Sequence, residues 1–163
     1  DILNQNKKIS HLFEKPLFLT RALQIINAKH SLPEGEGELI GDFIDLILLR
    51  EKNDKADPKL NIRTFKLAFS FLANCIYQFQ VSKNTTQVSN LPLHEYKIKS
   101  YLRDGLEFFC SEYASDPGYS GYLVRIALEL EIVVIHNDFI KFFHDNYFSY
   151  FHSEYIVLET QIN

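Results

Sequence analysis

The side chain best placed for chemistry is that of His144, which stands where an apolar strand pattern ends and a helical pattern begins. At such a junction a histidine can face an anion while backbone N–H groups at the helix start assist it. In the alternative interpretation, His144 or Asp145 caps the helix and has a structural role only. The local sequence leaves both interpretations open.

Other catalytic patterns are weak. None of the six histidines pairs with another at a spacing of four or joins a Cys/His cluster, so a zinc site has little support. The chain contains neither G-x-x-x-x-G-K-[ST] nor G-x-G-x-x-G. Gly118-Tyr-Ser-Gly121 lacks the residue that a nucleophile elbow needs between Ser and Gly, so it predicts a turn. Asp42 and Asp45 fit the solvated face of a helix. We expect no catalytic or metal-binding residues and no enzyme activity from this segment.

The sequence around His144 predicts the wing of a winged-helix domain. Ile132–His136 and Phe139–Phe143 flank the two-residue turn Asn137-Asp138, which predicts a β-hairpin. An aromatic-faced helix follows, and its inward positions recur at spacings of three and four. This order predicts the hairpin and closing helix of a winged-helix domain. The inward positions are Tyr147, Phe148, Phe151 and Tyr155.

The charge of this region argues against nucleic acid. Residues 131–163 hold five acids and one base, Lys141, and the whole chain has a net charge of −4. A DNA-binding wing needs Lys and Arg to replace counterions on phosphates. The helix Tyr122–Leu130 would contact the bases of DNA in a winged-helix domain. Its one basic residue, Arg125, is offset by the negative charge of Glu129. We therefore expect no nucleic-acid partner.

Apolar spacing predicts the remaining helices. The first begins at Pro16, which suits the first helical turn, and buries Leu19, Leu23 and Ile26. The second ends near Arg50. The buried face predicted for the second helix is Ile40, Phe43, Ile44 and Ile47.

A charged linker over residues 51–58 follows, with Asn61 as the cap of a third helix. A polar loop over Val81–Pro92 and a helix over Glu95–Glu112 come next. We predict a mainly α protein, with a helical subdomain over residues 1–52 and a winged-helix domain with one small β-hairpin over 57–163. The apolar seam of the third helix is Phe65, Phe69, Leu72, Ile76 and Phe79.

Whole-chain features restrict the context. Hydrophobic residues make up 46% of the chain, enough for a packed core. Cys75 and Cys110 fit two buried, reduced thiols better than a disulfide. No stretch is long and apolar enough to span a bilayer, and no signal peptide is evident, so we expect a cytoplasmic protein without a membrane partner. The chain starts at Asp1 and contains no Met, which suggests a segment of a longer protein.

Two runs carry a family resemblance. Lys15-Pro-Leu-Phe-Leu-Thr20, Leu32-Pro33, Glu38-Leu39 and Phe43–Glu51 resemble the region that follows the nucleotide-binding core in NACHT-type STAND NTPases. Phe143–Phe151 resembles that family's winged-helix signature, F-x-H-x-x-F-x-E-[FY]-F-A-A. The residues at matching positions are Phe142, His144, Tyr147, Tyr150 and Phe151. Ser149 departs from the family's usual Glu.

The resemblance implies a signalling or defence switch, antiphage immunity being one setting. It implies that Pro16 lies against adenine and that His144 contacts the β-phosphate of ADP. ATP or ADP with Mg²⁺ would bind to the parent protein, since this segment holds no cofactor of its own. The implied partners are the nucleotide-binding core of the same chain and further copies in a homo-oligomer on activation. Two alternatives remain, a helical protein-interaction adaptor and a nucleic-acid-binding winged helix.

Overall fold

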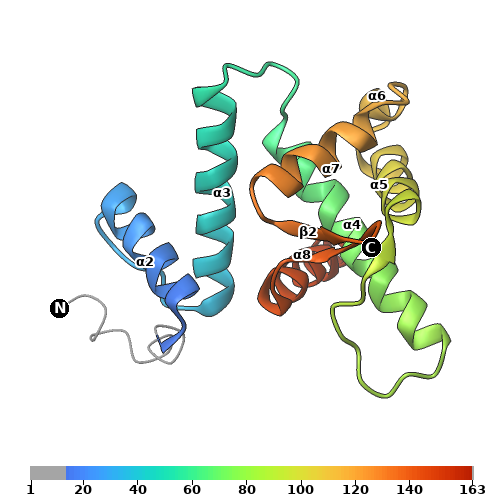
Figure 1. Ribbon diagram of the computed structural model, residues 1–163, viewed down its shortest axis with the longest axis horizontal. Coiled ribbons are helices and arrows are strands. Elements are labelled where there is room, and N and C mark those ends of the chain that lie inside the picture. The colour runs from blue at the N-terminus through green and yellow to red at the C-terminus, as the bar shows by residue number, and fades with distance from the viewer. Residues whose placement is uncertain (1–13, 163) are drawn as a thin grey trace. The chain divides into compact units, whose positions relative to one another are not determined.

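The chain forms two compact units, one ending at Pro58 and the other beginning at Lys59. The computed structural model describes residues 14–162, apart from the side chain of Leu17 (Figure 1). The boundary between the units falls at the end of the charged stretch predicted as a linker, and the first thirteen residues of the predicted 1–52 subdomain lie outside the described residues. No helix within residues 14–162 combines the length and apolar character needed to cross a membrane.

In the described part of the first unit, helix α2 (Pro16–Lys29) starts at the predicted proline and ends at His30 in the left-handed region (φ 60°). The predicted buried face of this helix is wrong by one position. Leu23 is 46% exposed, and the buried side chains are Phe18, Ala22 and Ile25.

Helix α3 (Glu36–Asp54) is longer than predicted, because it continues through the charged residues after Arg50. Charged side chains with long stems are good helix formers, and Glu51 pairs with Lys55 one turn later (2.6 Å). The chain leaves the helix at Ala56, where φ is 46°. Most of the predicted buried face is confirmed, with Ile47 only half-buried. The buried apolar side chains of α3 are Leu39, Ile40, Phe43, Ile44 and Leu48.

The second unit is organised around α4 (Ile62–Ser82), which packs against α5 (Glu95–Phe109) and α8 (Asp145–Ile162). Asn61 caps α4 as predicted, since its side chain accepts a hydrogen bond from the Thr64 N–H (2.9 Å). The predicted seam of α4 is buried except for Phe79, which is half-buried. The helix predicted over Glu95–Glu112 breaks at Cys110. Short helix α6 (Ser111–Ala114) and helix α7 (Tyr119–Glu129) follow.

The sheet has three antiparallel strands in the order β1-β3-β2: β1 (Leu93–His94), β2 (Val133–His136) and β3 (Phe139–Phe142). The predicted hairpin is confirmed. Its turn residues Asn137 (φ 49°) and Asp138 (φ 64°) both have positive φ, as a type I′ turn requires. The prediction of a single hairpin was incomplete, because β1 adds a third strand beside β3.

Aromatic packing joins the sheet to the helices of the second unit. Phe142 of β3 lies 5.5 Å from Phe151 of α8 and 6.3 Å from Phe69 of α4, between ring centroids. All three side chains are at most 1% exposed. This cluster packs the β2–β3 hairpin and α8 against α4.

The loop before β1 is anchored at two points. The Gln80 side chain exchanges two hydrogen bonds with the backbone of Ser89 (2.7 and 3.0 Å). The Asn90 side chain exchanges two more with the backbone of Phe142 (2.7 and 3.1 Å). The stretch predicted as a loop over Val81–Pro92 therefore starts later, after Ser82, and its second half is tied to the sheet.

Candidate functional site

His144 occupies the junction between β3 and α8, as predicted. Its Nδ1 accepts a hydrogen bond from the Asn146 N–H (3.1 Å), and its carbonyl oxygen accepts from the N–H groups of Tyr147 (3.0 Å) and Phe148 (3.4 Å). The side chain is half-buried. His144 therefore caps the start of α8, as one of the two interpretations predicts, whereas the contact of its ring with an anion stays a prediction. Because Nδ1 accepts a hydrogen bond, the neutral ring carries its proton on Nε2, the nitrogen suited to donate to an anion.

Pro16 stands at the first position of α2, with an exposed ring and a carbonyl oxygen that accepts from the Thr20 hydroxyl (2.9 Å). Lys15 before it has extended backbone, so the helix starts sharply at the proline. Pro16 belongs to the first unit and His144 to the second. Both sequence-predicted residues thus lie at helix starts.

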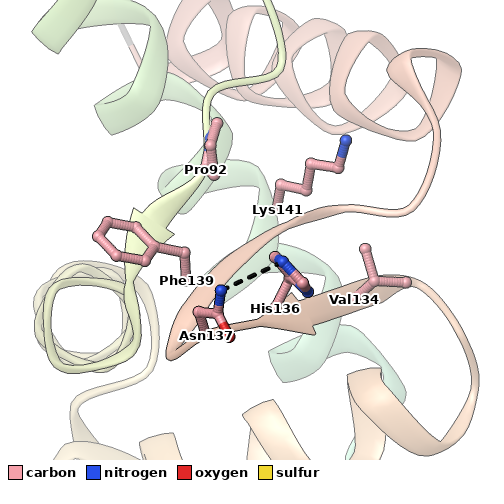
Figure 2. A pocket seen from close by; sticks show the side chains of 6 residues that line it. All are labelled: Pro92, Val134, His136, Asn137, Phe139 and Lys141. Atoms are coloured by element: carbon pink, nitrogen blue, oxygen red, sulfur yellow. Dashed lines mark hydrogen bonds between the residues drawn. The ribbon is translucent and has the colours of Figure 1, made fainter.

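A groove of about 510 Å³ lies on one face of the sheet, and we call it the wing-face groove. Figure 2 shows its lining side chains, two from each strand of the hairpin together with Asn137 of the turn and Pro92 before β1. The lining is apolar except for a few polar tips. The residues are Pro92, Val134, His136, Asn137, Phe139 and Lys141.

Strand pairing explains why these side chains share a face. Val134 lies opposite Lys141 and His136 opposite Phe139, and side chains directly opposite each other in an antiparallel pair point to the same side. Phe139 remains 47% exposed, and Lys141 has no ion-pair partner within residues 14–162. Sequence reasoning missed this groove. The signal was the alternation in β3 (Phe139–Phe142), whose odd positions face outward.

Further aromatic side chains lie near Phe139 of the groove. His94 of β1 lies 5.6 Å from Phe139 and 4.8 Å from Tyr96, between ring centroids. Tyr96 is 68% exposed. Clusters of exposed aromatic side chains on a soluble surface mark binding sites more often than single ones do.

The two cysteines of the chain lie in the second unit. Burial raises the pKa of the Cys75 thiol to about 12, and the nearby Asp104 carboxylate adds to the shift. A thiol with so high a pKa is a poor nucleophile at neutral pH. Cys110 is likewise a free thiol, and both cysteines are half-buried. Among the described residues, no group of three His, Cys, Asp or Glu side chains has a geometry suited to a metal ion.

The stretch Gly118–Gly121, predicted as a turn, is a turn only at its start, since Tyr119–Gly121 already form the first turn of α7. Asp116 Oδ1 accepts a hydrogen bond from the Gly118 N–H (2.9 Å), which lowers the pKa of the Asp116 carboxyl. The adjacent Lys59 ammonium lies 3.4 Å from Asp116 and lowers it further. Ser120 is buried in the first turn of α7. Asp116 thus stabilises the turn before α7.

Comparison of the chain with protein-family models, with curated proteins and with solved structures gave no match.

Proposed function

We propose that this chain is the helical and winged-helix segment of a nucleotide-dependent signalling or defence switch. In this role it senses whether ADP or ATP is bound and hydrolyses neither. The observation that carries the proposal is the position of its two candidate residues. Pro16 opens the first helix of one unit, and His144 opens the last helix of the other. This is the arrangement implied by the resemblance to NACHT-type STAND NTPases.

The order of elements in the second unit supports a winged-helix domain. A helix (α4), a short strand (β1), a helix pair (α5 and α7) and a hairpin follow in sequence, with α6 between the paired helices. The first strand lies beside the last strand of the hairpin. In this proposal the hairpin is the wing, and α8 is the closing helix that carries His144.

The parent protein would supply the rest of the site. Its nucleotide-binding core would hold ATP or ADP with Mg²⁺ through a phosphate-binding loop that this segment lacks. Pro16 would pack against the adenine, and His144 would donate a charge-assisted hydrogen bond to a phosphate. The switch would act in the cytoplasm without a membrane partner and would assemble into a homo-oligomer when activated. The isolated chain should show no micromolar ATP affinity by calorimetry.

A DNA-binding role fits the structure less well. In α7, the helix that would enter the major groove, the Arg125 guanidinium is engaged by Glu129 (3.2 Å) and lies over the Tyr122 ring (5.3 Å). Few cations are left to replace counterions on the phosphates. We expect no sub-micromolar, salt-dependent binding to duplex DNA in a gel shift.

The second candidate function is a protein-interaction module. The specific observation in its favour is the wing-face groove, which is lined by exposed Phe139 and has the exposed Tyr96 near it, next to His94. This function needs no nucleotide, and it is compatible with the switch as well as with an adaptor.

The switch is tested by two substitutions of His144 in the parent protein. His144→Ala removes the cap and the phosphate contact, whereas His144→Asn keeps a good N-cap and removes the imidazole. A lost charge-assisted hydrogen bond of about 1.5–3 kcal/mol should speed ADP release roughly ten- to a hundredfold in both variants. The melting temperature should fall only in His144→Ala. An unchanged ADP off-rate in both variants would show that His144 is only a cap, and the switch proposal would fail at this residue.

A further inference from the structure

Strand β2 has a free edge. The Phe143 N–H donates to the Ile132 carbonyl (3.0 Å), so by antiparallel alternation the backbone groups of Val133 and Ile135 point away from β3. No strand among residues 14–162 pairs with that edge. The Ile135 side chain is 45% exposed there. Unpaired N–H and C=O groups on an edge strand are a template for pairing with another chain.

The opposite side of the hairpin is closed. Strand β1 pairs with β3 at Leu93 and His94, and the Asn90 side chain satisfies both the N–H and the carbonyl of Phe142. Unpaired backbone groups of the hairpin therefore face outward on the β2 side.

The wing-face groove lies beside this free edge. Val134 and His136 of β2 line it, and exposed Phe139 of β3 lies behind them. An extended peptide added to β2 would place alternate side chains over the groove, while its backbone bonded to the edge. Main-chain pairing gives affinity in such complexes, and pockets for alternate side chains give specificity.

Two carboxylates bracket the free edge. Glu131 precedes β2 and Asp138 follows it in the turn, and both residues are exposed. Neither carboxylate has an ion-pair partner in the described part of the chain, and the strand between them carries no formal charge. A second copy pairing antiparallel through β2 would bring its own Asp138 toward Glu131, and like charges across a strand pair are destabilising. A partner with basic residues near both ends fits better.

We propose that the free edge of β2 binds an extended peptide with an apolar centre and a Lys or Arg near each end, which becomes a fourth strand of the sheet. A strand rises roughly 3.3 Å per residue, so bases about five to seven residues apart would reach Glu131 and Asp138. An aromatic side chain at the centre would enter the wing-face groove. This binding activity is independent of the proposed nucleotide role.

The test uses the 163-residue chain and the peptide Gly-Gly-Lys-Thr-Val-Phe-Val-Thr-Lys-amide, which carries fluorescein on its N-terminal amine so that both lysines keep their charge. Anisotropy at low salt should show saturable binding. Glu131→Gln with Asp138→Asn keeps the side-chain shapes and should weaken binding about three- to tenfold, as expected for two exposed ion pairs. The matched control, Asp104→Asn with Glu112→Gln, removes two charges from α5 and α6 and should leave binding unchanged.

The edge itself is tested in two ways. Ile135→Pro removes a backbone N–H that does not bond to β3, so the hairpin should survive while peptide binding is lost. Circular dichroism checks that this variant folds. A peptide with an N-methylated backbone keeps every side chain of the probe and should not bind, whether or not Ile135→Pro folds.

Several outcomes would overturn the proposal. The first is that the chain does not bind the peptide even at millimolar concentration. The second is that a peptide with Glu in place of both lysines binds as tightly as the original peptide. The third is that the N-methylated peptide binds as tightly as the original peptide. Analytical sedimentation tests the remaining alternative, in which a second copy of the chain pairs with the edge of β2. A concentration-dependent dimer that disappears in Ile135→Pro would assign the edge to a second copy of this chain instead of a basic peptide.

Discussion

His152 of α8 stacks on Tyr77 of α4, with ring centroids 4.3 Å apart and an angle of 23° between the planes. Phe148 lies on the same helix with its ring nearly parallel to that of His152 (7°). Burial between helices lowers the pKa of His152, because the charged imidazolium is poorly solvated there. The stack between α4 and α8 therefore favours the neutral form of His152.

This contact predicts that the second unit loses stability in mild acid. Because the pKa of His152 is lowered on folding, the unfolded chain binds more protons just below the ordinary value of 6.5. The stability that neutral His152 contributes is complete above pH 6.5, and it is lost as the pH falls through the lowered pKa of His152 in the folded chain. Urea midpoints at pH 7.5 and 5.0 should differ less in His152→Phe, which keeps the stack, than in the unsubstituted chain. Equal differences would show that His152 does not contribute.

The aromatic core predicts a large cost for Phe69→Ala. Phe69 is fully buried and stacks on Phe65 (4.4 Å between ring centroids), with Phe142 and Phe151 nearby. Truncation of a buried Phe costs about 3–5 kcal/mol in free energy of unfolding. Phe139→Ala, at a half-exposed position outside this core, should cost less than about 1.5 kcal/mol. Similar losses in both variants would place the hydrophobic core elsewhere.

Substitution of two helical glycines by alanine should change the free energy of unfolding in opposite directions. A Cβ on Gly105 of α5 would lie 2.9 Å from Cβ of Phe71, so α4 and α5 approach closely there. A Cβ on Gly121 of α7 would meet only the flexible end of Lys99, at 3.8 Å. Gly105→Ala should destabilise by about 1–3 kcal/mol through overpacking. Gly121→Ala should stabilise by about 0.4–1 kcal/mol, since it restricts the unfolded chain. Thermal unfolding of both variants tests the pair.

Periodicity in the sequence predicted most helices but not every buried face. In α2, Leu19 and Leu23 lie next to Phe18 and Ala22, so two helical registers look equally apolar. Packing against α3 selects the register that buries Phe18 and Ala22. Such a selection depends on tertiary contacts that single-sequence patterns do not contain.

The sheet shows a similar limit. Asn137 and Asp138 predicted the hairpin because they tolerate positive φ, and both adopt it. Strand β1 has only two residues, too few for an alternating pattern, and it forms because β3 offers a pairing edge. The wing-face groove needs both the register of the hairpin and the position of Pro92, so the sequence alone could place His144 but not this groove.

The Cys75 environment predicts slow alkylation. A thiol whose pKa is raised to about 12 is almost entirely protonated at pH 8, and only the thiolate reacts. In Cys110→Ser, where Cys75 is the remaining cysteine, iodoacetamide should react at least about a hundredfold more slowly than with a free cysteine peptide. Urea should abolish the difference. Rapid labelling of the folded variant would show that Cys75 is accessible and ionised.

The wing turn gives a last prediction, which separates fold stability from peptide binding. Asp138 has φ 64°, and its carbonyl accepts a hydrogen bond from the Glu95 N–H (2.9 Å), so the backbone there is fixed by both the hairpin and α5. Glycine adopts positive φ without a Cβ penalty, and Asn-Gly is the preferred type I′ turn. Asp138→Gly should therefore stabilise the second unit by about 0.5–1 kcal/mol.

The same change removes one of the two carboxylates that bracket β2, so Asp138→Gly should bind the basic peptide more weakly even though the domain is more stable. Asp138→Asn serves as the control, since Asn also tolerates positive φ and lacks the charge. It should weaken peptide binding to a similar extent with little change in melting temperature. If peptide affinity instead rises with stability across the three proteins, the Asp138 charge has no part in recognition, and rigidity of the β2 edge is the property that matters.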